Sequence, residues 1–157
     1  MPEREFYLEM AIEEAFHAIR HREGGPFGAV IVRNGELLGK GHNTVLKTHD
    51  PTAHAEINAI RNACNHVRDH HLTGAVLYSN FEPCPMCLSA IYWADIRSVC
   101  FSAGREQAGK IGFRDHHLYQ EFSLPREQRE VATTQVPLKA MEELMKAWDG
   151  MEGKVLY

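Results

Sequence analysis

Two short motifs constrain this chain most, because each places metal-binding side chains at the expected start of a helix. The first is His54-Ala-Glu56, and the second is Pro83-Cys84-Pro-Met-Cys87. Cys84 and Cys87 lie one helical turn apart, so their sulfurs share a helix face and can reach the same ion. A helix N-terminus and a nearby cation both favour the thiolate, which is the ligating form of cysteine. The spacing therefore predicts a metal site built at helix starts.

The donor set of these motifs, two thiolates and one imidazole, suits zinc. A structural zinc site normally takes a fourth protein ligand, and other candidates such as His42 have no close-spaced partner in the sequence. Three ligands, His54, Cys84 and Cys87, leave one position for water, which is the catalytic arrangement. Zinc lowers the pKa of bound water from about 15.7 to about 7. One Zn²⁺ per chain is therefore the expected cofactor.

Glu56 is the expected catalytic residue. A carboxylate beside the zinc site can take a proton from water and pass protons to the substrate ring and the leaving amine. Residues two apart on a straight helix point to nearly opposite sides, so His54 and Glu56 can both face the metal only in a first turn. Two other interpretations remain open: the Cys84-x-x-Cys87 pair is a redox or structural clip, or zinc stabilises a non-catalytic binding module. A structural site has no need of Glu56.

The apolar periodicity predicts one α/β domain over residues 1–157, with 150–157 as a C-terminal tail. Its strand–helix–strand order implies parallel pairing through a crossover, and Asn34-Gly35 predicts a hairpin. Helices are expected over Glu3–Arg22, from Asp50-Pro51 to about His66, and over Pro83–Ala94 and Leu138–Trp148. Strands are expected over Phe27–Val32, Leu37–Gly41, Ala75–Ser79, Ser98–Ser102 and Val131–Val136.

The composition argues against nucleic-acid and membrane partners. The chain has 17 Lys plus Arg against 21 Asp plus Glu, so no large basic surface is expected. No apolar run approaches the ~20 residues that span a bilayer. The first residues lack the basic region and unbroken apolar core of a signal peptide. We therefore expect a cytoplasmic protein, in which cysteines serve metal binding or catalysis rather than disulfides.

The segments Asp50-Pro-Thr-Ala-His-Ala-Glu56 and Glu82-Pro-Cys-Pro-Met-Cys87 resemble the cytidine deaminase-like superfamily. This superfamily includes cytidine and cytosine deaminases, tRNA adenosine deaminases and bacterial guanine deaminases. The resemblance implies a three-layer α/β/α sandwich with a five-stranded mixed sheet and with zinc held at two helix N-termini. Because several branches share both motifs, these motifs do not identify the substrate.

Other segments are similar to the bacterial guanine deaminases, in order and over nearly the whole chain. This similarity implies a homodimer that deaminates free guanine to xanthine and ammonia, with exchange of C-terminal segments as one arrangement. Phe81 departs from the family, which often has a small residue there, and residues 116–129 match no family pattern. The similar segments are Gly25–Val30, Asn43, Ile91–Ala94, Gly112–Asp115 and Tyr157.

Five side chains outside the zinc motifs are expected to bind the base. The amide of Asn43 offers both a donor and an acceptor, which suits a purine edge, and Phe27 and Trp93 can supply flat faces. The resemblance adds Asp115 as an acceptor for the ring N–H and amine. It also adds Tyr157 as an aromatic residue that closes the site.

Alternative substrates remain open at this point. A tRNA adenosine deaminase shares the zinc motifs, but it should carry a basic face for phosphates. Guanosine, cytosine or another aminated heterocycle is the other alternative. A small purine base is the expected partner, and nucleic acid is not.

Overall fold

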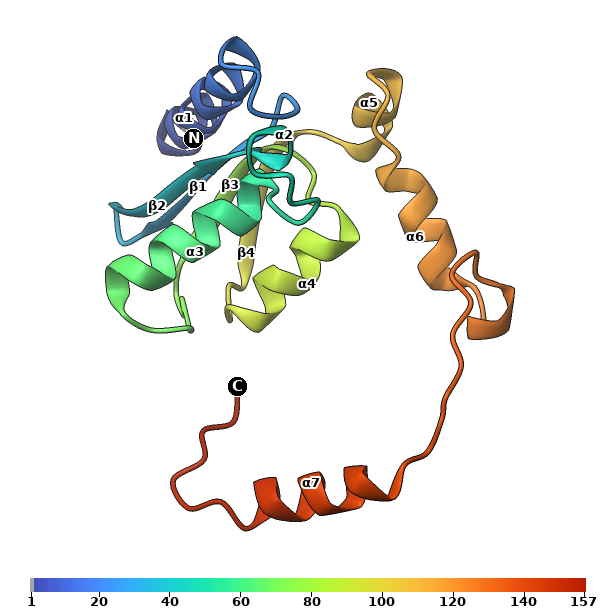
Figure 1. The fold of residues 1–157 in the computed structure, drawn as a ribbon. Helices are drawn as coiled ribbons and strands as arrows, with labels where there is room; N and C mark the ends of the chain where they lie inside the picture. The colour runs from blue at the N-terminus through green and yellow to red at the C-terminus, as the bar shows by residue number, and fades with distance from the viewer. Residues whose placement is uncertain (1) are drawn as a thin grey trace. The chain divides into compact units, whose positions relative to one another are not determined.

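The computed structural model of the chain describes residues 2–157, which divide into two compact units between Gln120 and Glu121. The first unit contains a β-sheet and the helices around it, and the second contains a 3₁₀ turn and a helix over residues 139–149 (Figure 1). The helix over residues 115–123 crosses the boundary. The helices are α1 (Pro2–Arg20), α2 (Val45–Thr48), α3 (Ala55–Val67), α4 (Pro85–Trp93), α5 (Arg105–Lys110), α6 (Asp115–Ser123) and α7 (Lys139–Asp149), with η1 at Arg126–Gln128. The strands are β1 (Gly28–Arg33), β2 (Glu36–His42), β3 (Val76–Phe81) and β4 (Ser98–Ala103).

The sheet is mixed, with the strand order β2-β1-β3-β4. Strand β1 pairs antiparallel with β2 and with β3, whereas β3 and β4 are parallel. The parallel pair is joined through α4, as predicted for a crossover. The predicted hairpin is also present, because Asn34 and Gly35 have φ of 53° and 81°, the positive values of the tight turns that match strand twist.

Helices cover both faces of the sheet within the first unit. Along β1, Ala29 and Ile31 face a core shared with α3 and α4, while Val30 and Val32 face a second cluster that includes Tyr7 of α1. This alternation follows from the two-residue period of a strand. A strand buried on both faces reads as a continuous apolar run, as this one does. The α/β fold with a mixed sheet is therefore confirmed.

The expected fifth strand is wrong. No strand forms over residues 131–136 in the described chain, and the sheet has four strands. Val131 and Val136 are 73% and 70% exposed, so the β-favouring composition of this segment has no packed surface to lie on. Strand propensity expresses packing against neighbours more than a backbone preference. In this structure no neighbouring strand supplies it.

The predicted start of the second helix is also wrong, with a consequence for the active site. Asp50 and Pro51 form a turn in which the backbone N–H of Thr52 donates to Asp50 Oδ1 at 2.8 Å. Helix α3 begins only at Ala55, and His54 is its N-cap residue. An Asp side chain can accept a hydrogen bond from a backbone N–H two residues later and so favour a turn over a helix. Asp50 does this with Thr52, and it stabilises the turn instead of the helix.

The second unit contains α7, which confirms the helix predicted over Leu138–Trp148. Its apolar side chains recur at helical spacing and include Met141, Leu144, Met145 and Trp148, each at least 45% exposed. None of the helices in residues 2–157 is both long and apolar enough to cross a membrane.

Candidate active site

Two helix caps bring the predicted metal ligands together. His54 precedes α3 with φ −70° and ψ 159°, and Cys84 precedes α4 with φ −67° and ψ 168°. Both residues are extended, and neither side chain caps its own helix. Their side chains are therefore available to a ligand instead of the helix backbone. Cys87 follows in the first turn of α4, one turn from Cys84.

The three donor atoms form a tight group. His54 Nδ1 lies 3.6 Å from Cys84 Sγ and 3.4 Å from Cys87 Sγ, and all three donors are within 4.8 Å of one another. Zn–N and Zn–S bonds of about 2.0 and 2.3 Å place tetrahedral ligands roughly 3.6 Å apart. The distances therefore fit a zinc ion at the centre of this group.

The proton balance of the site also fits a cation. A hydrogen bond from the Cys87 thiol, together with the nearby His54, holds the pKa of Cys84 at about 4. The pKa of Cys87 is raised, because its proton is shared with Cys84 and because the group is buried. The hydrogen bond to Cys84 in turn raises the pKa of His54. Without a metal the two sulfurs share one proton, whereas a divalent cation would allow both to ionise.

Glu56 lies beside this group and is 5% exposed. Its Oε2 accepts a hydrogen bond from Cys87 Sγ at 3.4 Å. Burial raises the pKa of Glu56 to about 7, and the Cys84 thiolate adds to this effect. Because α3 begins at Ala55, His54 lies outside the helix in extended backbone, so the two side chains reach one site. A carboxyl of this kind can hold or release a proton near neutral pH.

The pocket around these residues is narrow. Its enclosed volume is about 40 Å³, far below the ~300–1,000 Å³ of typical small-molecule sites. The rings of Phe27 and Phe113 meet edge to face across it, 4.5 Å apart. This space fits water and is smaller than a purine ring. The lining residues are Phe27, Asn43, His54, Glu56, Glu82, Cys84, Phe113 and Asp115.

Asn43 is held firmly at the pocket wall after β2. It is 4% exposed, and its backbone N–H donates to the Phe27 carbonyl at 3.0 Å. Its Oδ1 accepts from the Val45 backbone N–H at 3.1 Å, so the Nδ2 group is what it can offer a ligand. Gly24 packs directly on Asn43 and leaves no room for a Cβ atom. This contact explains the glycine in the loop after α1.

Asp115 also lines the pocket, as the first residue of α6. Burial raises its pKa, with a further contribution from the Cys84 thiolate. Two lining residues, Glu82 and Phe113, were not predicted. Glu82 binds Arg105 through an ion pair of 2.8 Å and a backbone hydrogen bond of 3.0 Å. The sequence did offer a signal for each residue: Glu82 directly precedes the Pro83-Cys84 motif, and Phe113 lies within the Gly112–Asp115 segment.

Trp93 is not among the residues that line this pocket in the described chain, and its predicted stacking on the base stays a prediction. It is 64% exposed at the end of α4. Ile91, two residues earlier, is buried in the core. Residues two apart lie on nearly opposite sides of a helix, which turns Trp93 away from the core face. Tyr157 belongs to the second unit, and its role at the site stays a prediction.

Comparison with known proteins places this site in a family. Residues 1–103 match the cytidine and deoxycytidylate deaminase zinc-binding region. The chain is 40% identical over 153 residues to a guanine deaminase of Bacillus subtilis, covering 98% of each. It is 42% identical over 108 residues to a tRNA-specific adenosine deaminase of Aquifex aeolicus, covering 69% of this chain and 71% of the relative. The crystal structure of the Bacillus subtilis guanine deaminase superposes with a TM-score of 0.93 over 98% of both chains. The chain therefore belongs to the cytidine and deoxycytidylate deaminase family, and it is a hydrolytic deaminase.

Proposed function

We propose that this enzyme converts free guanine to xanthine and ammonia, with one zinc ion held by His54, Cys84 and Cys87. The observation that carries the proposal is the extent of similarity. The guanine deaminase relative matches 98% of the chain, whereas the tRNA deaminase relative matches 69%. The residues beyond the shared zinc-binding region thus match the guanine deaminase relative.

The chemistry requires a proton carrier at the zinc site. When bound, zinc supplies the Lewis acidity that eases deprotonation of the attacking water. Glu56 takes that proton and delivers protons to the ring nitrogen and to the amine leaving C2. The water oxygen stays on C2 and ammonia departs, so guanine and water balance xanthine and ammonia. The near-neutral pKa of Glu56 suits a group that must both accept and donate.

The base is proposed to enter between Phe27 and Phe113, with its polar edge on Asn43 and Asp115. Nδ2 of Asn43 can donate to a ring acceptor, and the Asp115 carboxylate can accept from a ring N–H. Both residues already line the pocket. Separation of the two phenyl rings would admit the purine and keep an apolar surface on its face.

Replacing Asn43 by Ala is expected to lower kcat/KM for guanine by about 10–100-fold, since one hydrogen bond to a buried polar group contributes ~1–3 kcal/mol. KM should carry part of the loss, because the contact is made in the bound substrate as well. Steady-state kinetics of xanthine formation measures this. Asn62→Ala, an exposed neighbour on α3 that donates to the Lys40 carbonyl, is the control and should keep parental kinetics. Equal kinetics in both variants would remove Asn43 from the site.

We also propose that residues 1–157 form one deaminase domain in which 150–157 cover the active site. The side chains of Val155, Leu156 and Tyr157 are apolar or aromatic, where a solvated tail is usually polar. Lys154 Nζ binds Asp149 Oδ1 at 3.1 Å, which ties the tail to the end of α7. A cover of this kind excludes water from the reaction.

Deletion of Met151–Tyr157 is expected to leave zinc bound and the first unit folded. It should lower kcat/KM for guanine about tenfold or more, because one hydrogen bond to the base and the exclusion of water from the site are lost. Both kcat and KM should change. Tyr157→Phe removes only the hydroxyl and keeps the ring, so its loss in kcat/KM should be smaller than that of the deletion. Full guanine turnover by the truncated protein would show that the tail takes no part.

A homodimer in a cytoplasmic setting completes the proposal, with exchange of C-terminal segments as one arrangement. Tyr92, Trp93 and Phe101 expose large apolar surfaces on α4 and on the edge strand β4. Such surfaces on a folded protein favour association. We therefore propose that this face takes part in the subunit interface.

The second candidate is deamination of adenosine in tRNA, favoured by the 42% identity to the Aquifex aeolicus enzyme. Ammonia release from guanine, guanosine, adenine, cytosine and cytidine, with inosine formation in tRNA measured beside it, separates the candidates. Guanine should give by far the highest kcat/KM. Inosine formation with inert guanine would replace the proposal with the tRNA reaction.

A further inference from the structure

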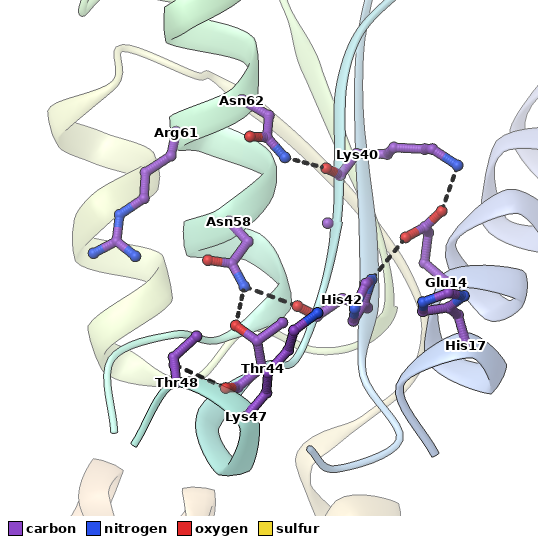
Figure 2. A pocket seen from close by; sticks show the side chains of 11 residues that line it. Glu14, His17, Lys40, His42, Thr44, Lys47, Thr48, Asn58, Arg61 and Asn62 are labelled. Atoms are coloured by element: carbon purple, nitrogen blue, oxygen red, sulfur yellow. Dashed lines mark hydrogen bonds and ion pairs between the residues drawn. The ribbon is translucent and has the colours of Figure 1, made fainter. Parts of the chain in front are cut away.

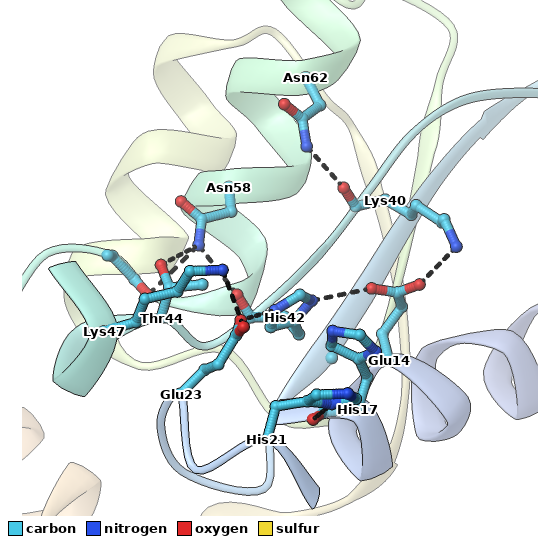
Figure 3. Close-up of polar contacts among 12 residues, drawn as sticks. Glu14, His17, His21, Glu23, Lys40, His42, Thr44, Lys47, Asn58 and Asn62 are labelled. Atoms are coloured by element: carbon cyan, nitrogen blue, oxygen red, sulfur yellow. Dashed lines mark hydrogen bonds and ion pairs between the residues drawn. The ribbon is translucent and has the colours of Figure 1, made fainter. Parts of the chain in front are cut away.

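A second group of metal-binding side chains lies outside the active site, where the end of α1 meets the end of β2 (Figures 2 and 3). His17 comes from α1, Glu23 from the following loop, and His42 is the last residue of β2. One donor atom of each lies within 4.8 Å of the other two. His17 and His42 also line an open cavity of about 580 Å³, which gives solvent access to the group.

The two ring nitrogens of His42 both face carboxylates. Nδ1 lies 3.1 Å from Glu14 Oε2, and Nε2 lies 2.7 Å from Glu23 Oε2 (Figure 3). A neutral imidazole carries only one N–H, so it can donate to only one of them. Metal-binding histidines typically donate their other N–H to a carboxylate, the place that Glu14 takes here. On the other side of the ring, Nε2 and Glu23 Oε2 share a proton when no metal is bound, and both atoms become ligands if a cation replaces that proton.

The other groups around this position set the kind of cation. The ring of His17 lies 4.6 Å from that of His42, centroid to centroid. Lys47, 2.8 Å from Glu23 Oε1, and His42 hold the pKa of Glu23 at about 2, so the carboxylate is ionised. Lys47 contacts Oε1 of Glu23, whereas Oε2 faces the ring of His42. Two imidazoles and one carboxylate favour Zn²⁺, Ni²⁺ or Co²⁺ over Mg²⁺ or Ca²⁺, which prefer oxygen ligands.

We propose that His17, Glu23 and His42 form a second site, for a divalent transition-metal ion, with Glu14 orienting the ring of His42. The site is separate from the zinc of the proposed reaction. Its ion would link α1 to the two segments that hold Asn43, because His42 directly precedes Asn43 and Glu23 directly precedes Gly24, which packs on it. The paired charges of Lys40 with Glu14 and of Lys47 with Glu23 make binding weaker than at a dedicated thiolate site.

The test uses tag-free protein that already carries zinc, titrated with ZnCl₂ by calorimetry, with zinc content measured after equilibrium dialysis. The parent should bind a second equivalent, and its unfolding temperature should rise with free zinc, because a ligand of the folded state stabilises it. His17→Ala and Glu23→Gln should each lose the second equivalent and keep the first. Glu14→Gln should weaken the second by about 10–100-fold, the usual effect of losing an outer carboxylate.

Two histidine variants serve as controls. His21 lies in the turn directly after α1, where its ring stacks on that of His17 at 4.0 Å. His66 lies on the exposed side of α3. His21→Ala and His66→Ala should both retain the second equivalent. The proposal is overturned if the parent binds no second zinc, which would assign a proton to the space between His42 and Glu23. It is also overturned if His17→Ala or Glu23→Gln keeps parental affinity, or if His21→Ala abolishes binding as His17→Ala does.

Discussion

Glu56→Gln is expected to lower kcat for guanine by about 10²–10⁴-fold, the range of a lost general acid–base group. The amide preserves the shape of the side chain but cannot exchange protons. Zinc content should stay at one equivalent, because Glu56 is placed as a proton carrier and not as a ligand. KM should change little, since the contribution is made in the transition state.

The same substitution should leave the fold intact, and its unfolding temperature should equal or exceed that of the parent. Burial of the Glu56 carboxyl is unfavourable for its charged form, as its raised pKa shows, and active-site residues of this kind reduce stability in exchange for function. Glu36→Gln, on an exposed part of β2, is the matched control and should retain activity. Loss of zinc in Glu56→Gln would make the carboxylate a ligand.

Cys84→Ala is expected to remove both zinc and activity. Only His54 and Cys87 would remain in the group, and two protein ligands do not form a catalytic zinc site. The loss in guanine turnover should exceed ~10²-fold, the upper end of what an outer-sphere partner contributes to metal affinity or activity. Zinc analysis of the purified variant, together with xanthine formation, measures both effects on one sample.

Cys64→Ala is the control for that experiment. Cys64 is a partly buried thiol that packs against the core from α3, away from the lining of the pocket. It should keep one zinc and parental turnover, with a modest loss of stability from the vacated volume. Metal-free Cys84→Ala with full activity would contradict a zinc mechanism.

The grouping of His54, Cys84 and Cys87 could be predicted from sequence because these residues lie in short, local motifs. In the sequence, His54 and Glu56 lie two residues apart on an expected helix. Side chains two apart on a helix point to nearly opposite sides, so both could not easily face one ion. The structure resolves this difficulty, because α3 begins at Ala55 and leaves His54 in extended backbone. Propensity alone could not locate that start, since Asp50-Pro51 is equally suited to a turn.

Features that depend on distant contacts could not be predicted. The expected strand over Val131–Val136 has the right composition, but the segment forms no strand pairing in the described residues. His42 has no close-spaced ligand in the sequence, yet the approach of α1 to β2 brings His17 and Glu23 to it. The spacing of residues in the sequence predicts local geometry, whereas contacts between distant segments can be seen only in the folded structure.

The most direct test of hydrolytic guanine deamination is the fate of oxygen and nitrogen. Zinc-loaded protein is incubated with guanine in ¹⁸O-labelled water, and xanthine is analysed by mass spectrometry beside an assay of ammonia. The account predicts one labelled oxygen in each xanthine and one ammonia released with it. Guanine recovered unchanged, from protein that carries its zinc and forms inosine in tRNA, would contradict it.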